Sequence, residues 1–263
     1  MSSTRKLFTF IALPLVIIFV VVTVLASRTG GKSDGPSAAE SETVESEDSS
    51  AAQLKLQNLG GITLAAYNAA SGLAGDIKFS KNGLDTARGL ETPFFMFGQN
   101  LPKNSVDEPQ RINPNFEFRN IATQIDIIAA IDGIVVDLKQ QPGSNDYEIF
   151  LIPNDNSPWV VGYDHVVSPT VKRGEKVKVG QKLGLIAPEN SGGYRYELQI
   201  NNNNDDTMHC PTELLDASVK ETISAQITQL AADWVAWYGK DVFGTHTNGC
   251  LTPTLTAAKS EGR

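Results

Sequence analysis

The sequence predicts an all-β domain, either a sandwich or a small barrel, followed by a single helix near the C-terminus. Short segments rich in Ile and Val recur between residues 110 and 203, and turn residues separate them, a pattern typical of such β folds. The segment Ser218–Tyr238 contains no Gly or Pro, and its apolar residues recur every three or four positions, which indicates an amphipathic helix.

The β region can be divided into strands by its turn signals. The dipeptide Asp132-Gly133 is a strong tight-turn signal and predicts a strand on each side of it. Glycines delimit a further short strand at Val179–Ile186. The segment Tyr194–Ile200, in which apolar and polar residues alternate, is expected to be the last strand of the sheet. The expected strands are Ile125–Ile131, Ile134–Leu138, Tyr147–Ile152, Trp159–His165, Val179–Ile186 and Tyr194–Ile200.

The helix has recognisable end signals. Asp216 or Ser218 can cap its first turn, and Gly239 can end it. Two interpretations of Trp234 and Trp237 stay open. They either pack the helix on the β domain or form an exposed surface for a partner.

The N-terminal segment predicts the compartment. Arg5 and Lys6 precede twenty uncharged residues, Leu7–Ala26, which is enough to cross a bilayer as a helix. We therefore expect a cytoplasmic stub at residues 1–6, a transmembrane anchor, and an extracytoplasmic remainder. The alternative is a cleaved signal sequence with secretion of the chain.

The remaining segments differ in composition. Residues 27–53 are acidic and rich in Ser, Gly and Ala, which favours a flexible linker. Residues 54–109 are expected to be an irregular cover for the β domain at residues 110–203, and residues 204–263 a helical extension. The net charge of −8 argues against a nucleic-acid partner.

The chain has two cysteines, Cys210 and Cys250. An even number of cysteines in an exported chain predicts a disulfide, which would close the extension. The rival interpretation is a metal site that adds His209 and His246, although this spacing matches no standard zinc module.

Three segments in order resemble the LytM/lysostaphin-type zinc endopeptidase family. They are QIDIIAAIDGIVVDL (124–138), GYDHVVSPTVKRGEKVKVGQKLGLIA (162–187) and SGGYRYELQI (191–200). The resemblance implies a duplicated hybrid motif, the β fold of that family. A lipoyl or biotinyl carrier is the competing use of such a fold, but no lysine stands at the comparable Asp132-Gly133 turn.

The resemblance also implies where the zinc ligands would lie. The His-x-x-x-Asp pair of the family falls on Asn113 and Glu117, and its His-x-His falls on Tyr194 and Tyr196. Only His165, from the Tyr-x-His motif, is retained, as a relic of the catalytic site. Amide and phenol groups are poor zinc ligands, so we expect no metal, no cofactor and no catalytic residue.

Three functions follow from this pattern. The first is a non-catalytic domain outside the cytoplasm that binds cell-wall material or regulates an envelope protein, with Tyr194 and Tyr196 either lining a groove or filling space. The second is an active zinc peptidase that cleaves peptidoglycan peptides through Glu117 and His165, with His209 as an optional further ligand. The third is a structural subunit of a surface assembly.

Overall fold

The computed structural model describes residues 53–82, 84, 91–103, 105, 107–189, 192–244 and 248–256, all within one unit, Asp48–Arg263. Among these residues, no helix is both long and apolar enough to cross a membrane. The expected anchor at Leu7–Ala26 lies outside them and stays a prediction.

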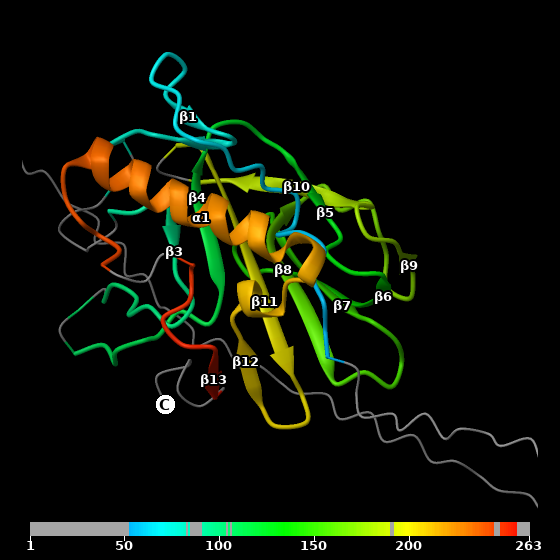
Figure 1. Ribbon diagram of the computed structural model, residues 1–263. Helices are drawn as coiled ribbons and strands as arrows, with labels where there is room; N and C mark the ends of the chain where they lie inside the picture. The colour runs from blue at the N-terminus through cyan, green and yellow to red at the C-terminus, as the bar shows by residue number, and fades with distance from the viewer. Residues whose placement is uncertain are drawn as a thin grey trace, which may run out of the picture. The chain divides into compact units, whose positions relative to one another are not determined.

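The described chain is mostly antiparallel β, with one long helix near its C-terminus (Figure 1). This confirms the predicted β class. The sheet runs in the order β1-β2-β4-β11-β10-β8-β7-β6-β9, while β3 pairs with β4, β5 with β10, and β12 with both β11 and β13. The strands are β1 (Leu73–Ala74), β2 (Ile77–Lys78), β3 (Phe94–Phe95), β4 (Phe116–Ile121), β5 (Asp126–Ile128), β6 (Gly133–Gln140), β7 (Tyr147–Ile152), β8 (Trp159–Val167), β9 (Lys176–Val177), β10 (Lys182–Pro188), β11 (Tyr194–Asn202), β12 (Thr207–His209) and β13 (Thr254–Thr256).

Strand β11 organises the sheet because it pairs with β4 on one side and with β8 on the other. Its side chains alternate between two faces, as the pleat requires. Tyr196, Leu198 and Ile200 are fully buried in the hydrophobic core, whereas Arg195 and Glu197 flank Tyr196 in sequence. The core therefore covers one face of β11, and the charged residues share the other.

The dipeptide Asp132-Gly133 has a strand on each side, β5 and β6, as expected, but the two do not form a hairpin. β5 pairs with β10, whereas β6 pairs with β7 and β9, so the two strands that flank this dipeptide are not partners. Asp132 instead accepts hydrogen bonds from the Val179 backbone nitrogen at 2.8 Å and the Lys178 Nζ at 2.6 Å. The loop is thus fastened to the turn between β9 and β10.

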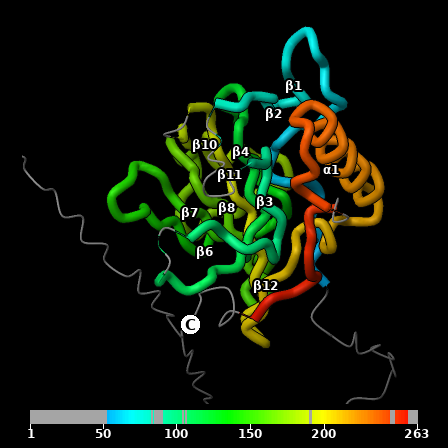
Figure 2. The backbone as a smooth tube through the Cα atoms, turned by 90° about the vertical axis from the view of Figure 1, so that its left-hand side faces the viewer, coloured from blue at the N-terminus to red at the C-terminus, as the bar shows by residue number. Residues whose placement is uncertain are grey.

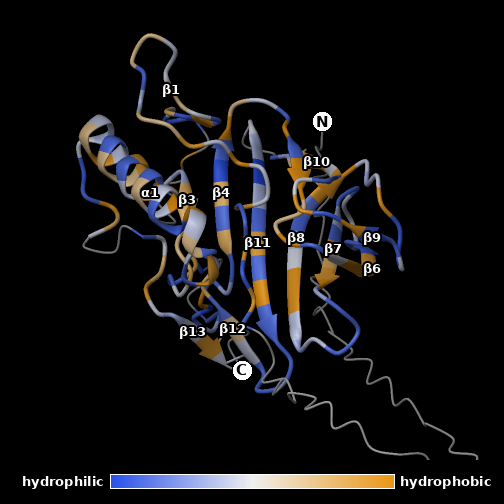
Figure 3. Ribbon diagram, turned by 45° about the vertical axis from the view of Figure 1, so that its right-hand side comes forward, coloured by the Kyte–Doolittle hydropathy of each residue, from blue (hydrophilic) through white to orange (hydrophobic). Residues whose placement is uncertain are grey.

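Helix α1 (Ala217–Tyr238) covers one face of the sheet (Figures 1 and 2). Asp216 caps its first turn by accepting from the Ser218 nitrogen, and Gly239 ends it with φ 82°. Hydrophobic and hydrophilic residues both occur along the helix (Figure 3). Trp234 is fully buried and packs edge-on against Phe79. Trp237 is partly buried and packs against the same core, which favours the packing interpretation of both tryptophans.

The segment ahead of the β region is built into the core. Leu56 is fully buried and forms a parallel bridge with Leu215, just after the short 3₁₀ helix Pro211–Leu214. The Gln57 nitrogen donates to the Ala130 carbonyl at 2.9 Å. Residues expected to form an irregular cover therefore complete the hydrophobic core.

A disulfide closes the C-terminal extension. Cys210 and Cys250 are bonded across 40 residues of sequence, as predicted. The backbone of Cys250 also forms an isolated parallel β-bridge with Phe97, and β13 pairs with β12. The last described segment is therefore fixed to the sheet. With both sulfurs in the disulfide, they are not available to the rival metal site. His246 of that rival site lies outside the described residues.

Candidate functional site

Three carboxylates lie in one row across three neighbouring strands. Glu197 of β11 stands opposite Glu117 of β4 on one side and opposite Asp164 of β8 on the other. Like charges directly opposite one another on a sheet are destabilising unless other groups compensate them. The compensating groups are basic side chains on the same three strands. We call Glu117, Arg119, Asp146, Asp164, His165, Arg195 and Glu197 the ionic cluster.

A β-bulge brings Asp164 and His165 together. Against β7, the register of β8 shifts, so that Tyr147 pairs with Val166 but Ile149 pairs with Tyr163. Two residues of β8 thus oppose a single residue of β7, and His165 has a positive φ of 61°. Neighbouring residues in a regular strand point to opposite faces, whereas a bulge re-aims a side chain. The Asp164 Oδ2 therefore lies 3.6 Å from the His165 Nε2.

The imidazole of His165 is held from both sides. Its Nδ1 lies 2.6 Å from the Asp146 Oδ2, and its Nε2 lies 3.1 Å from the Glu197 Oε1. The ring is 5% exposed, so these contacts form in a largely dry environment. Asp146 fixes the ring orientation and leaves the Nε2 directed at the row of carboxylates.

The guanidinium of Arg195 lies among the other groups of the cluster. Its Nη1 is 3.7 Å from the Glu117 Oε1, and its Nη2 is 3.8 Å from the Glu197 Oε1. The same Nη2 is in close contact with the His165 Nε2. On the far side of Glu117, the Arg119 Nε lies 3.8 Å from the same Oε1, and Arg119 also binds Glu189.

Burial and mutual charge shift the pKa values of the cluster. Burial, with the charge of Glu197, raises the pKa of Glu117 to about 8 against the pull of both arginines. Burial likewise raises the pKa of Asp164 to about 7, although His165 opposes it. Burial by itself would lower the pKa of His165, but its hydrogen bond to Glu197 and the nearby carboxylates raise it to about 9.

The pKa of Glu197 moves in the opposite direction from that of Glu117. Burial would raise it, but the hydrogen bond from His165 and the charges of His165 and Arg195 lower it below its ordinary value. Near neutral pH the cluster therefore holds a protonated Glu117 beside an ionised Glu197 and a cationic His165.

The structure brings together only two of the five residues that the resemblance implicated, Glu117 and His165. The Asn113 amide donates to the Met96 and Asn115 carbonyls at 3.2 and 2.9 Å, and so it braces a loop. Tyr194 packs against the hydrophobic core, and Tyr196 is fully buried in it. Tyr196 fills space beside Gly60, whose φ of 77° suits glycine and whose missing side chain leaves room for the phenol.

Five members of the ionic cluster were not singled out from the sequence: Arg119, Asp146, Asp164, Arg195 and Glu197. The alternation in YRYELQI could have indicated Arg195 and Glu197, because Tyr196, Leu198 and Ile200 form the apolar face of this strand. The polar face of β11 is then Arg195 and Glu197, one position along from the two tyrosines. Asp146 lies in a loop and carried no such signal.

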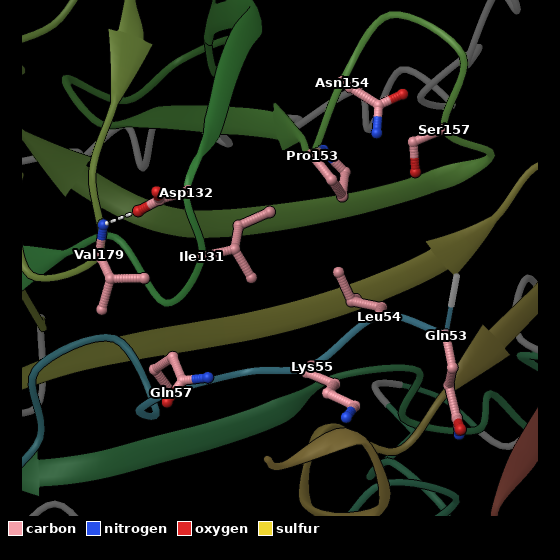
Figure 4. A pocket seen from close by; sticks show the side chains of 10 residues that line it. All are labelled: Gln53, Leu54, Lys55, Gln57, Ile131, Asp132, Pro153, Asn154, Ser157 and Val179. Atoms are coloured by element: carbon pink, nitrogen blue, oxygen red, sulfur yellow. Dashed lines mark hydrogen bonds between the residues drawn. The ribbon is translucent and has the colours of Figure 1, made fainter. Parts of the chain in front are cut away.

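Two other features lie apart from the cluster. A hollow of about 310 Å³ is lined by residues ahead of β1, by the loop before β6 and by the loop between β7 and β8 (Figure 4). No member of the ionic cluster lines it. His209 contacts Thr207, with the Nε2 at 2.9 Å from the hydroxyl, and packs edge-on against Trp159.

No family model and no curated protein matches the sequence. Solved structures do match. The catalytic domain of the antimicrobial peptidase lysostaphin from Staphylococcus simulans is 21% identical over 41% of this chain and 78% of its own, with a TM-score of 0.34. The catalytic domain of the prophage-encoded M23 protein EnpA from Enterococcus faecalis is 19% identical over 42% and 82%, with a TM-score of 0.31. A chain of the SpoIIQ-SpoIIIAH pore forming complex is 13% identical over 64% and 97%, with a TM-score of 0.39.

The matching structures include lysostaphin-type peptidase domains, the family that the three sequence segments resemble. Their TM-scores are low, so the function of this chain has to rest on its own contacts.

Proposed function

We propose that this chain is a non-catalytic, peptidase-like domain that works outside the cytoplasm by binding cell-wall material or an envelope protein. The observation that carries the proposal is the position of Arg195, whose guanidinium lies among Glu117, Glu197 and His165. A permanent cation in this place opposes the binding of a metal ion to the same oxygen and nitrogen atoms.

The residues present do not fit a catalytic zinc. Such a site needs three firm ligands and one open position. Both nitrogens of His165 are hydrogen-bonded, Nδ1 to Asp146 and Nε2 to Glu197. Asn113 and Tyr196, at positions that the resemblance assigned to ligands, are occupied in bracing and core packing. We derive no hydrolytic step from this donor set.

The second function, a zinc peptidase with an unusual ligand set, had His209 as an optional further ligand beside Glu117 and His165. His209 lies on β12 and contacts Thr207 and Trp159, which lie outside the ionic cluster. Burial lowers its pKa, consistent with a neutral ring packed against Trp159. The contacts of His209 give no support to this alternative.

The compartment is supported by two observations. The disulfide between Cys210 and Cys250 is typical of oxidising environments outside the cytoplasm. The apolar segment Leu7–Ala26 has the length of a membrane anchor. The ionic cluster is buried and its charges are compensated by one another. We therefore propose that the domain binds a ligand and does not catalyse a reaction.

The test uses the purified full-length chain in detergent. We expect no zinc above background by elemental analysis and no cleavage of purified peptidoglycan. Co-sedimentation with peptidoglycan, and crosslinking on intact cells, separate a cell-wall ligand from a protein partner. Stoichiometric zinc together with peptidoglycan cleavage that His165→Ala abolishes would overturn the proposal.

A further inference from the structure

We propose that a second hollow, at the end of β4, binds the carboxylate group of a small ligand through Asn120 and Lys78. We call it the β4 hollow. It has a volume of about 210 Å³ and is lined by residues at and after the end of β2, by the end of β4 and by the two glycines ahead of β11. No member of the ionic cluster lines it, so the inference does not rest on the proposed function.

The first support is the conformation of Asn120. Against β11, two residues of β4, Arg119 and Asn120, stand opposite the single residue Arg195, which is a β-bulge. Asn120 has a φ of 54°, a value that asparagine, aspartate and glycine adopt more readily than other residues. A bulge re-aims a side chain, and the Asn120 side chain lines the β4 hollow.

The second support is the unsatisfied amide of Asn120. The residue is only 7% exposed, and within the described part of the chain its Nδ2 has no hydrogen-bond partner. A buried polar group without a partner lowers stability, and native proteins supply the partner from the chain, from water or from a ligand. Since an amide nitrogen donates, the partner that Asn120 lacks is an acceptor, such as a carboxylate oxygen.

The third support is the charge of the β4 hollow. Of the described residues that line it, Lys78 is the only charged one. The pairing of Ile77 with Ile121 places Lys78 beside Asn120 on the neighbouring strand (Figure 2). Asp76 does not line the hollow, and its Oδ2 accepts a backbone hydrogen bond at 2.7 Å. An anion is therefore favoured there, although the chain as a whole has a net charge of −8.

A carboxylate matches these two donors. It has one negative charge and two oxygen atoms, one for the Asn120 amide and one for the Lys78 ammonium group. The β4 hollow is smaller than the usual site for a whole small molecule, about 300–1,000 Å³, so it suits the charged end of a ligand. Inorganic phosphate is the other common oxyanion, and the experiment separates the two.

The experiment titrates the purified full-length chain, in detergent, with three probes. They are N-acetyl-alanyl-alanine, its C-terminal amide and sodium phosphate. Nuclear magnetic resonance of the isotope-labelled asparagine side chains reports binding at Asn120, whose signal is identified by its loss in Asn120→Asp. We expect the free acid to shift this signal and the amide and phosphate to leave it in place.

Variants separate the two donors, and their dissociation constants are measured by calorimetry. Asn120→Asp tolerates the positive φ but replaces the donor by an anion, and it should weaken binding of the acid by about tenfold or more. Asn120→Gly suits the same φ and lacks the amide, so it decides the point if the aspartate variant does not fold. Lys78→Glu should weaken binding by about fivefold. Lys172→Glu, an exposed lysine outside the β4 hollow, should bind like the natural chain.

Four results would overturn the inference. They are equal binding of the acid and its amide, binding of phosphate without the acid, undiminished binding by the folded Asn120 variants, and no shift with any probe. The last result would mean that the β4 hollow holds water alone. Selective binding of the acid that both Asn120 and Lys78 variants weaken, and that Lys172→Glu does not, supports it.

Discussion

Glu117 and Glu197 stand directly opposite each other on the antiparallel strands β4 and β11. Two carboxylates in this relation repel each other, and the repulsion is relieved when one of them holds its proton. The pKa of Glu117 is raised and that of Glu197 is lowered, so Glu117 holds the proton and Glu197 carries the negative charge. The folding of this domain is therefore coupled to pH.

We predict that the domain loses stability as the pH rises from neutral to alkaline. The folded pKa of His165, about 9, exceeds its ordinary 6.5, so the stabilisation it contributes is complete below about 6.5 and is lost as the pH passes through 9. Glu117 and Asp164 have raised pKa values, so their contribution to stability is lost earlier, as the pH rises from 4.5 to about 8 for Glu117 and from 3.8 to about 7 for Asp164. Denaturant unfolding should show that the free energy of unfolding falls by on the order of 3 kcal/mol between pH 6.5 and 9 from His165 alone.

A matched pair of variants checks the contribution of Glu117. Glu117→Gln imitates the protonated carboxyl, so at alkaline pH the variant should have a higher melting temperature than the natural chain. The difference between the two melting temperatures should become smaller at acidic pH. Glu221→Gln removes an exposed carboxyl from α1 and should leave the pH profile unchanged. A flat profile for the natural chain would contradict the buried charge assignment.

Two buried tyrosines make a second prediction. The Tyr163 hydroxyl accepts a hydrogen bond from the Ala130 nitrogen at 2.8 Å, whereas the Tyr196 hydroxyl is buried and has no hydrogen-bond partner within the described residues. Tyr163→Phe should cost about 1 kcal/mol, and Tyr196→Phe should be neutral or slightly stabilising. Urea unfolding of both variants gives the comparison. A costly Y196F would mean that its hydroxyl has a partner.

The third prediction concerns the disulfide. Replacing Cys210 and Cys250 by alanine should lower the free energy of unfolding by roughly 2–4 kcal/mol, because the unfolded chain regains the freedom of a 40-residue loop. Hydrogen exchange should quicken in residues 248–256, which pair with β12 and contact Phe97. Unchanged exchange there would show that β13 holds without the covalent link.

The fourth prediction separates the two tryptophans of α1. Trp234 is fully buried, and its Nε1 donates to the Glu91 carbonyl at 2.9 Å. Trp234→Ala should therefore destabilise the domain by about 3–5 kcal/mol. Trp237 is only partly buried, so Trp237→Ala should cost less. Equal losses in denaturant unfolding would contradict the helix orientation described above.

The elements that local pattern specifies were predictable. Tyr147–Ile152 was predicted with its observed bounds, and the helix prediction began one residue after the observed start at Ala217. Both segments have strong periodicity and clear end signals. The disulfide followed from the cysteine count and the exported character of the chain.

The candidate site was harder because its residues meet through strand pairing. The resemblance pointed to Tyr194 and Tyr196, yet a shift of one residue along a strand exchanges its two faces. Arg195 and Glu197 therefore face the site, while Tyr196 enters the core. The bulge at Asp164 and His165 depends on the register against β7, which no local sequence signal specifies.

The attachment of Leu56 has a mechanical consequence. Its nitrogen donates to the Leu214 carbonyl and its carbonyl accepts from the Asp216 nitrogen, each at 2.8 Å, just ahead of α1. A force applied to the chain ahead of residue 53 would act on these two hydrogen bonds before it reached the central strands. The start of the domain would thus bear an applied force first and protect the ionic cluster from it.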